Sequence, residues 1–138
     1  MYRIGLIAFL FMPQLSQARG IGEPTHLYES AAEAFQFVAK KDKDGIMLKW
    51  KIASCCKLYI DKIKVRVSGS EISHEAFQLL RPYILDNSQP EGYEKVSIGD
   101  FWIRIPKSNG SLDVTYQGCN SLGFCYPPQR VLIQGESW

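Results

Sequence analysis

The sequence predicts an all-β fold, a two-sheet antiparallel sandwich, and three observations support this prediction. Apolar residues alternate with polar ones in several short segments, which is the period-two pattern of strands that bury one face. Clusters of Gly, Pro, Asn and Asp separate these segments, as turns between antiparallel strands do. The chain of 138 residues is long enough for one compact core and too short for two domains of ordinary size.

The first predicted hairpin contains the most regular strand of the chain. Residues 34–39 form its first strand, and residues 41–45 form the turn. In residues 46–52, apolar side chains alternate with largely basic ones. One face of this second strand is therefore apolar, and we expect Trp50 on that face to lie in the core.

Four further segments have strand character. Residues 63–67 and 101–105 alternate in the same way, and residues 112–118 and 130–133 read as later strands. Asn109 and Gly110 are typical of a hairpin turn, so we expect the strand at 101–105 to pair with the strand that follows it.

One region does not follow the period of two. In residues 73–85, Phe77, Leu80 and Ile84 stand at helical spacing, and Ser73 is suited to cap a helix. A short helix and an irregular strand both remain open there. Residues 87–92 contain Pro90 and a glycine, which predicts a loop.

The N-terminal segment predicts export. Residues 1–3 are basic in character, residues 4–12 are apolar, and residues 16–18 supply the small residues that signal peptidase requires. We expect cleavage after Ala18, which leaves a mature domain of residues 19–138. A membrane anchor is the weaker alternative, because nine apolar residues cover only about half of the hydrocarbon thickness of a bilayer.

The composition of the mature chain gives no reason to expect nucleic acid, a membrane surface or a metal as partner. Loss of Arg3 lowers the 16 Lys and Arg to 15, against 14 Asp and Glu, so the net charge is close to zero. His26 and His74 are the two histidines, and we expect both on the surface or in loops. We expect no cofactor, and a monomer.

Cys119 and Cys125 are the strongest candidates for a functional site. Five residues separate them between the strand at 112–118 and two prolines, so we expect the sulfurs to face each other near a hairpin end. Such a pair is either a redox-active disulfide or a structural cross-link, and the second is common in exported proteins. Gly118 and Gly123 either leave space beside the sulfurs or serve the turn geometry.

Residues 114–119 and 123–128, Val-Thr-Tyr-Gln-Gly-Cys and Gly-Phe-Cys-Tyr-Pro-Pro, resemble the active-site hairpin of the N-terminal periplasmic domain of DsbD, the bacterial thiol:disulfide interchange protein. The resemblance extends more weakly over most of the mature chain. The further matching positions are Glu33, Ala34, Phe35, Trp50, Lys51, Ile52, Leu58, Tyr59, Tyr93, Lys95, Ile105 and Pro106.

The resemblance implies an immunoglobulin-like sandwich with a redox cysteine pair on a hairpin at one end. In that family a membrane-embedded reductant of the DsbD/CcdA type, fed from cytoplasmic thioredoxin, reduces the pair. The pair then reduces periplasmic thioredoxin-like acceptors such as disulfide isomerases and cytochrome c maturation thioredoxins. The matching positions imply that Cys125 forms the mixed disulfide with the partner and that Cys119 resolves it. Full-length members continue into membrane and thioredoxin-like domains, so a chain of this length is expected to use a separate reductant.

The resemblance also implies residues that shield the disulfide or contact partners. Tyr59 matches a position that lines the active site. The family places a phenylalanine over the sulfurs where this chain has Gly92, and Tyr93 is the alternative cap. Tyr116 and Phe124 flank the cysteines and either pack the hairpin or shield it.

The second cysteine pair, Cys55 and Cys56, has no counterpart in the family pattern. A bond between adjacent cysteines needs a strained ring, so we expect two thiols that are free or separately buried, on opposite faces of a strand. One of them could then be an exposed thiol or a third participant near the active hairpin. No His or Lys is next to Cys119 or Cys125 in the sequence, so nothing there indicates a strongly lowered thiol pKa.

Two other functions remain open from the sequence alone. The chain could be a non-catalytic secreted binding module whose cysteine pair is a structural cross-link. It could also be an assembly factor that recognises the cysteines of apo-cytochromes or metal sites without passing electrons.

Overall fold

The computed structural model describes residues 30–88, 90, 92–135 and 138. The predicted signal peptide at 1–18, its cleavage site and His26 lie outside these residues. In the part of the chain that is described, no helix is long and apolar enough to cross a membrane.

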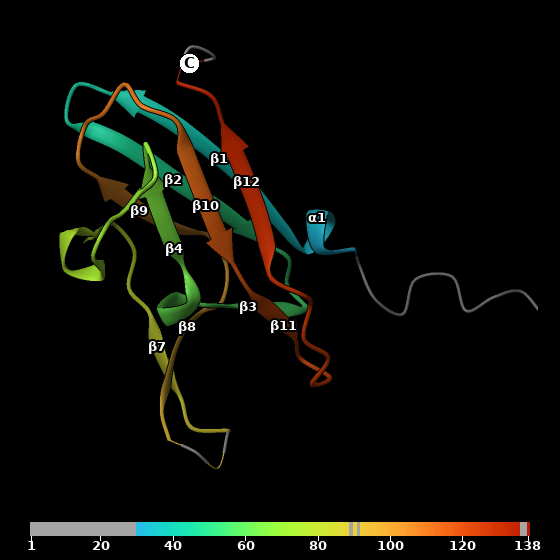
Figure 1. Ribbon diagram of the computed structural model, residues 1–138. Helices are drawn as coiled ribbons and strands as arrows, with labels where there is room; N and C mark the ends of the chain where they lie inside the picture. The colour runs from blue at the N-terminus through green and yellow to red at the C-terminus, as the bar shows by residue number, and fades with distance from the viewer. Residues whose placement is uncertain (1–29, 89, 91, 136–137) are drawn as a thin grey trace, which may run out of the picture.

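The described residues form three antiparallel sheets of four strands each (Figure 1). The first sheet has the order β1 (Phe35–Asp42), β2 (Gly45–Ile52), β9 (Phe101–Ile105), β6 (Gln78–Leu79). The second has the order β12 (Gln129–Ile133), β10 (Leu112–Tyr116), β4 (Lys64–Val67), β5 (Ser70–Glu71). The third has the order β11 (Gly118–Asn120), β3 (Cys56–Tyr59), β8 (Glu94–Ser97), β7 (Ile84–Asp86). Three single turns complete the fold: α1 (Ala31–Ala34), η1 (Ile60–Lys62) and η2 (His74–Ala76).

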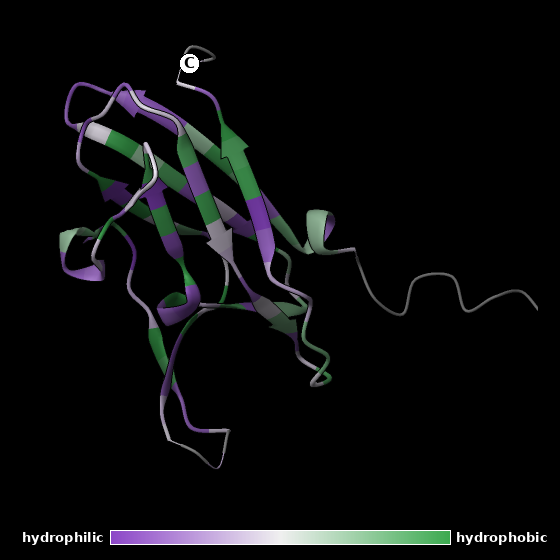
Figure 2. Cartoon of the chain, viewed as in Figure 1, coloured by the Kyte–Doolittle hydropathy of each residue, from purple (hydrophilic) through white to green (hydrophobic). Residues whose placement is uncertain are grey.

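The first two sheets pack face to face and enclose the main core, which confirms the predicted all-β sandwich. Alternate residues of β2, β9 and β10 are buried, and the hydropathy bands along these strands follow the same period (Figure 2). Trp50 is fully buried, and its ring lies 5.7 Å from that of Tyr116 across the core. The third sheet was not predicted. It lies at one end of the sandwich, where β3 and β11 cross below β10 and β12 (Figure 1).

The hairpin of β1 and β2 is tighter than the sequence predicts. Asp42 pairs directly with Gly45, so the turn is two residues long and residues 41–42 belong to the strand. The Asp42 carboxylate accepts a hydrogen bond from the N–H of Asp44 at 2.8 Å and forms an ion pair with Arg104 of β9 at 3.0 Å. These contacts fix the turn, so the predicted turn at 41–45 is too long.

The predicted hairpin at Asn109 and Gly110 is wrong. Strand β9 pairs with β2 and β6 in the first sheet, whereas β10 pairs with β12 and β4 in the second. Residues 106–111 therefore cross from one sheet to the other. The N–H of Ser68 donates to the carbonyl oxygen of Ser111 at 2.9 Å, so the connection is held against the end of β4.

The ambiguous region at 73–85 is neither one helix nor one strand. Ser73 caps the 3₁₀ turn η2, where its hydroxyl accepts a hydrogen bond from the N–H of Glu75. The short strands β6 and β7 follow. His74 lies in this turn with its side chain exposed, as predicted.

Candidate redox site

The chain changes sheets at Gln117, which separates β10 of the second sheet from β11 of the third. The carbonyl oxygen of Gln117 accepts a hydrogen bond from the N–H of Tyr59 at 3.0 Å. Its side-chain amide donates to the carbonyl oxygen of Tyr126 at 3.1 Å. The predicted strand at 112–118 is therefore two strands, and the break places Cys119 on the third sheet.

Gly118 is required by close packing. A Cβ at this position would lie 2.5 Å from the carbonyl oxygen of Lys57 and closer still to the ring of Phe35. Gly123 is different, because it has φ of +90° and open space around its Cα. Packing explains the first glycine and turn geometry explains the second.

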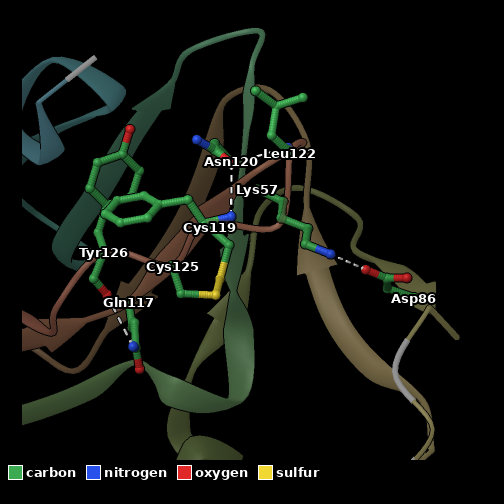
Figure 3. The surroundings of a disulfide bond; sticks show 9 residues. Lys57, Asp86, Gln117, Cys119, Asn120, Leu122, Cys125 and Tyr126 are labelled. Atoms are coloured by element: carbon green, nitrogen blue, oxygen red, sulfur yellow. Dashed lines mark hydrogen bonds and ion pairs between the residues drawn. A yellow bond between two sulfur atoms is a disulfide. The ribbon is translucent and has the colours of Figure 1, made fainter. Parts of the chain in front are cut away.

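Cys119 and Cys125 form a disulfide at the end of a narrow hairpin (Figure 3), and their Cα atoms are 3.9 Å apart. The two residues form an antiparallel bridge. The N–H of Asn120 donates to the carbonyl oxygen of Phe124 at 2.8 Å, and the N–H of Tyr126 donates to that of Gly118 at 3.0 Å. The predicted facing of the two cysteines is confirmed.

Asn120 fixes the loop between the cysteines. Its side chain is buried, and its Oδ1 accepts hydrogen bonds from the N–H groups of Leu122 and Phe124, each at 3.0 Å. This residue was not among those predicted from the sequence. An Asn followed by Ser, Leu and Gly is a turn signal that would have indicated it.

The two cysteines differ in exposure. Cys119 is 2% exposed and packs with Tyr59 and Val96 in a small cluster separate from the main core. Cys125 is exposed to solvent. An attacking thiol from outside would therefore meet Cys125 first, because Cys119 is buried.

The structure brings two of the predicted shielding residues to the hairpin. Tyr59 is buried beside Cys119. Phe124 is 48% exposed, and its ring contacts that of buried Tyr126 at 5.2 Å. The next residue along from Phe124 is Cys125, so an exposed aromatic surface adjoins the accessible sulfur.

The other two predicted shielding residues lie elsewhere. Tyr116 is buried in the main core, where the loss of solvent raises the pKa of its hydroxyl, so its position fits the packing alternative. Tyr93 is 72% exposed on the connection between β7 and β8. Gly92 beside it has φ of +127°, a conformation that favours glycine over a phenylalanine.

A lysine that the sequence analysis did not consider lies opposite Cys119. In the register of β3 and β11, Lys57 is the direct partner of Cys119. Its ammonium group forms an ion pair with Asp86 of β7, and both side chains are largely buried (Figure 3). The hydrogen bond between them raises the pKa of Lys57 and lowers the pKa of Asp86 to about 2. Only the strand register reveals this neighbour, because Lys57 is distant from Cys119 in the sequence.

Cys55 and Cys56 form a disulfide with each other, which corrects the expectation of two separate thiols. Cys55 lies in the turn after β2, where the N–H of Cys56 donates to the carbonyl oxygen of Ala53 at 3.0 Å. The alternation of a strand does not apply in a turn, so both side chains pack against the main core. The turn is hydrogen-bonded to the redox hairpin, the segment of residues 118–126 that carries Cys119 and Cys125, because the N–H of Ser121 donates to the carbonyl oxygen of Cys55 at 2.7 Å. No cysteine in the described ranges is free.

Among the residues described, no group of three or more His, Cys, Asp or Glu side chains is placed to hold a metal ion.

Curated relatives with similar sequences are thiol:disulfide interchange proteins DsbD. The protein from Haemophilus ducreyi is 33% identical over 112 residues, which cover 77% of this chain and 18% of the relative. The protein from Pasteurella multocida is 30% identical over 141 residues, which cover 96% of this chain and 23% of the relative. The chain thus spans about a fifth of the length of these relatives.

Solved structures with a similar fold are N-terminal domains of DsbD from Neisseria meningitidis. The reduced domain matches with a TM-score of 0.66 at 20% identity, over 77% of this chain and 87% of that domain. A complex of the DsbD and PilB N-terminal domains matches with a TM-score of 0.61 at 19% identity, over 79% of this chain and 88% of that chain. These matches confirm the immunoglobulin-like sandwich.

The family model described as "Thiol:disulfide interchange protein DsbD, N-terminal" matches residues 26–137. A match over this range includes every strand of the three sheets and both cysteines of the hairpin. The chain therefore belongs to the family of DsbD N-terminal domains.

Proposed function

We propose that this chain is a periplasmic thiol–disulfide interchange domain in which Cys119 and Cys125 carry the electrons. A membrane-embedded reductant supplies them, and periplasmic thioredoxin-like proteins accept them. Family membership supports the reaction class. A signal peptide at residues 1–18 would deliver the domain of residues 19–138 to the periplasm.

The unequal exposure of the two cysteine residues is the observation that carries the assignment of roles. Exposed Cys125 meets the partner, and buried Cys119 completes the reaction from inside the hairpin. Thiol–disulfide exchange needs both positions, because the attacking sulfur must approach in line and a second thiol must lie within reach.

The exchange proceeds in two steps that conserve electrons. The Cys125 thiolate of the reduced domain attacks a disulfide sulfur of the partner, which forms a mixed disulfide and releases one partner thiolate. The Cys119 thiolate then attacks the sulfur of Cys125. The Cys119–Cys125 disulfide re-forms, and the partner leaves with both of its sulfurs reduced, each taking one proton.

Exposed apolar side chains around Cys125 suit a protein partner. Leu122 is 73% exposed and Phe124 is 48% exposed, both in the loop between the cysteines. Tyr93, on the connection between β7 and β8 of the same sheet, is 72% exposed and is available as a more distant contact. The complex of a related DsbD N-terminal domain with the N-terminal domain of PilB supports a protein as the partner.

Mixed-disulfide trapping tests this proposal. Purified, oxidised N-terminal domain of Neisseria PilB is mixed with the reduced domain carrying Cys119→Ala or Cys125→Ala, each in a Cys55→Ser/Cys56→Ser background. We expect Cys119→Ala to accumulate a covalent complex through Cys125, detected by mass. Cys125→Ala should form none, because the Cys119 sulfur is buried.

The same experiment separates the redox function from a structural cross-link. If neither variant forms a complex and both lose much of their stability, the disulfide is structural and the chain acts as a binding module. The background variant with both hairpin cysteines intact is the matched control, and it should exchange without accumulating the complex.

A further inference from the structure

We propose that Lys57 is a positioning residue for the exchange reaction, whose ammonium group is shared between Asp86 and the reduced Cys119 and stabilises the thiolate of Cys119. This inference rests on the proposed function for its role in turnover, although the interaction itself is a property of the folded domain.

The two faces of the third sheet separate structural from reactive side chains. On β3, Cys56 and Leu58 point to the main core, whereas Lys57 and Tyr59 point to the opposite face. Strand register puts Cys119 on that opposite face, directly across from Lys57.

The same face continues across the sheet to Asp86. Val96 of β8 pairs with Tyr59 of β3 and with Ile84 of β7, and Asp86 lies two residues beyond Ile84 on the same side. Cys119, Lys57 and Asp86 therefore share one surface, with Lys57 between the sulfur and the carboxylate (Figure 3).

Lys57 is within reach of both groups. Directly opposed residues on antiparallel strands have Cβ atoms about 5 Å apart, and a lysine side chain spans a similar length. In the disulfide form the sulfur of Cys119 has no charge, so the ammonium group binds Asp86. Reduction creates a thiolate on Cys119, and this second anion competes for the same cation.

Asp86 stays in place when Lys57 turns toward the sulfur. Its Oδ1 also accepts a hydrogen bond from the N–H of Ser88 at 2.9 Å. The pKa of Asp86 is about 2, so the carboxylate is ionised throughout the range in which a thiol titrates. Asp86 therefore competes with the Cys119 thiolate for the Lys57 ammonium group at every pH at which the thiol titrates.

Other charged and titratable groups lie around this surface. Tyr59 lies between Lys57 and Lys62, whose ammonium groups are 5.6 and 4.8 Å from its ring centre. Lys95 of β8 pairs with Asp61 of η1 at 3.9 Å. Glu94 of β8 is opposite Asp86 in the register and adds a second negative charge on that side. Lys57 is the cation placed directly across from Cys119.

Stabilisation of the Cys119 thiolate by Lys57 would accelerate the second step of exchange, in which the mixed disulfide is resolved. Cys119 must be a thiolate to attack the Cys125 sulfur of the mixed disulfide, re-form the hairpin disulfide and release the partner's thiolate. An adjacent cation increases the thiolate fraction near neutral pH.

The test is a pH titration of Cys119 as the sole thiol of the domain, in a Cys125→Ala background that also carries Cys55→Ser and Cys56→Ser. The Cβ chemical shift of Cys119, followed by NMR, reports the thiol pKa even though the sulfur is buried. We expect Lys57→Met to raise this pKa by about one unit and Asp86→Asn to lower it by a smaller amount. Lys57→Arg should retain most of the effect, and Lys49→Met, in the exposed pair with Asp100, should leave the pKa unchanged.

The expected pKa shifts of Cys119 have opposite signs in Lys57→Met and Asp86→Asn, and this distinguishes an electrostatic effect from a structural one. A merely structural ion pair would make Lys57→Met and Asp86→Asn shift the titration in the same direction or leave it unmoved, and either result overturns the proposal. Asp86→Asn tests it separately should Lys57→Met fail to fold. With an active partner, Lys57→Met should slow resolution of the mixed disulfide near pH 7 and recover at high pH. Absence of exchange in the unsubstituted domain would count against the proposed function instead, since the titration needs no partner.

Discussion

Replacement of Asn120 by Ala should destabilise the redox hairpin and the whole domain with it. The substitution removes one buried acceptor that receives two backbone hydrogen bonds, from Leu122 and Phe124. Each such bond contributes about 1 kcal/mol net, so the expected loss is about 2 kcal/mol of unfolding free energy. For a domain of about 120 residues that loss lowers Tm by about 8 °C.

Urea unfolding of the oxidised domain, followed by tryptophan fluorescence, measures this change. Ser121→Ala is the matched control, because Ser121 is the exposed neighbour in the same loop, and it should remain within about 0.5 kcal/mol of the unsubstituted domain. An Asn120→Ala midpoint equal to that of the control would refute the reasoning. It would mean that the disulfide alone gives the loop its shape.

Three further perturbations have outcomes that the structure sets. Gly118→Ala should cost about 2 kcal/mol in urea unfolding, since the new methyl group overlaps the ring of Phe35 and a neighbouring backbone oxygen. Replacement of both Cys119 and Cys125 by Ser should lower the unfolding free energy by about 2 kcal/mol in the same assay, because the disulfide closes a short loop with a sequence separation of six. A loss of about 5 kcal/mol would favour a structural cross-link. Asp86 has a folded pKa of about 2, below its usual 3.8, so its contribution to stability is complete above pH 4 and declines as pH falls toward 2. Asp86→Asn should make the unfolding free energy less dependent on pH between pH 4 and pH 2. An unchanged dependence on pH would contradict a contribution from the ion pair.

The long strands were predicted correctly because apolar and polar side chains alternate over enough residues to show the period of two. Eight residues of β2 and five each of β9 and β10 bury every second side chain. The third sheet escaped prediction because its strands have three or four residues, too few to establish a period. The turn signal at Asn109 misled for another reason: a local turn does not reveal whether the chain returns to the same sheet or crosses to the other.

Of the candidate site, only the cysteine pair could be predicted from the sequence. The spacing of Cys119 and Cys125, with the resemblance of the surrounding residues, indicated the pair and its hairpin. Lys57 and Asp86 meet through the register of β3, β7, β8 and β11, which no local pattern specifies. The bond between Cys55 and Cys56 was not predicted, because the strain of a ring between adjacent cysteines and the alternation of a strand both argued against it, whereas Cys55 lies in a turn.

The single-residue step at Gln117 has a mechanical consequence. Its backbone is bonded to Tyr59 on one side, and its side chain is bonded to Tyr126 on the other. With one residue between two sheets, and with its carbonyl oxygen and side-chain N–H both hydrogen-bonded, the junction is poorly suited to act as a hinge. The hairpin that carries the cysteine pair is thus tied to the sandwich at this residue, and under the proposed function the geometry for in-line attack would come from how the incoming protein orients itself. Under the proposed function, the partner and not the hairpin would then bear most of the entropic cost of alignment.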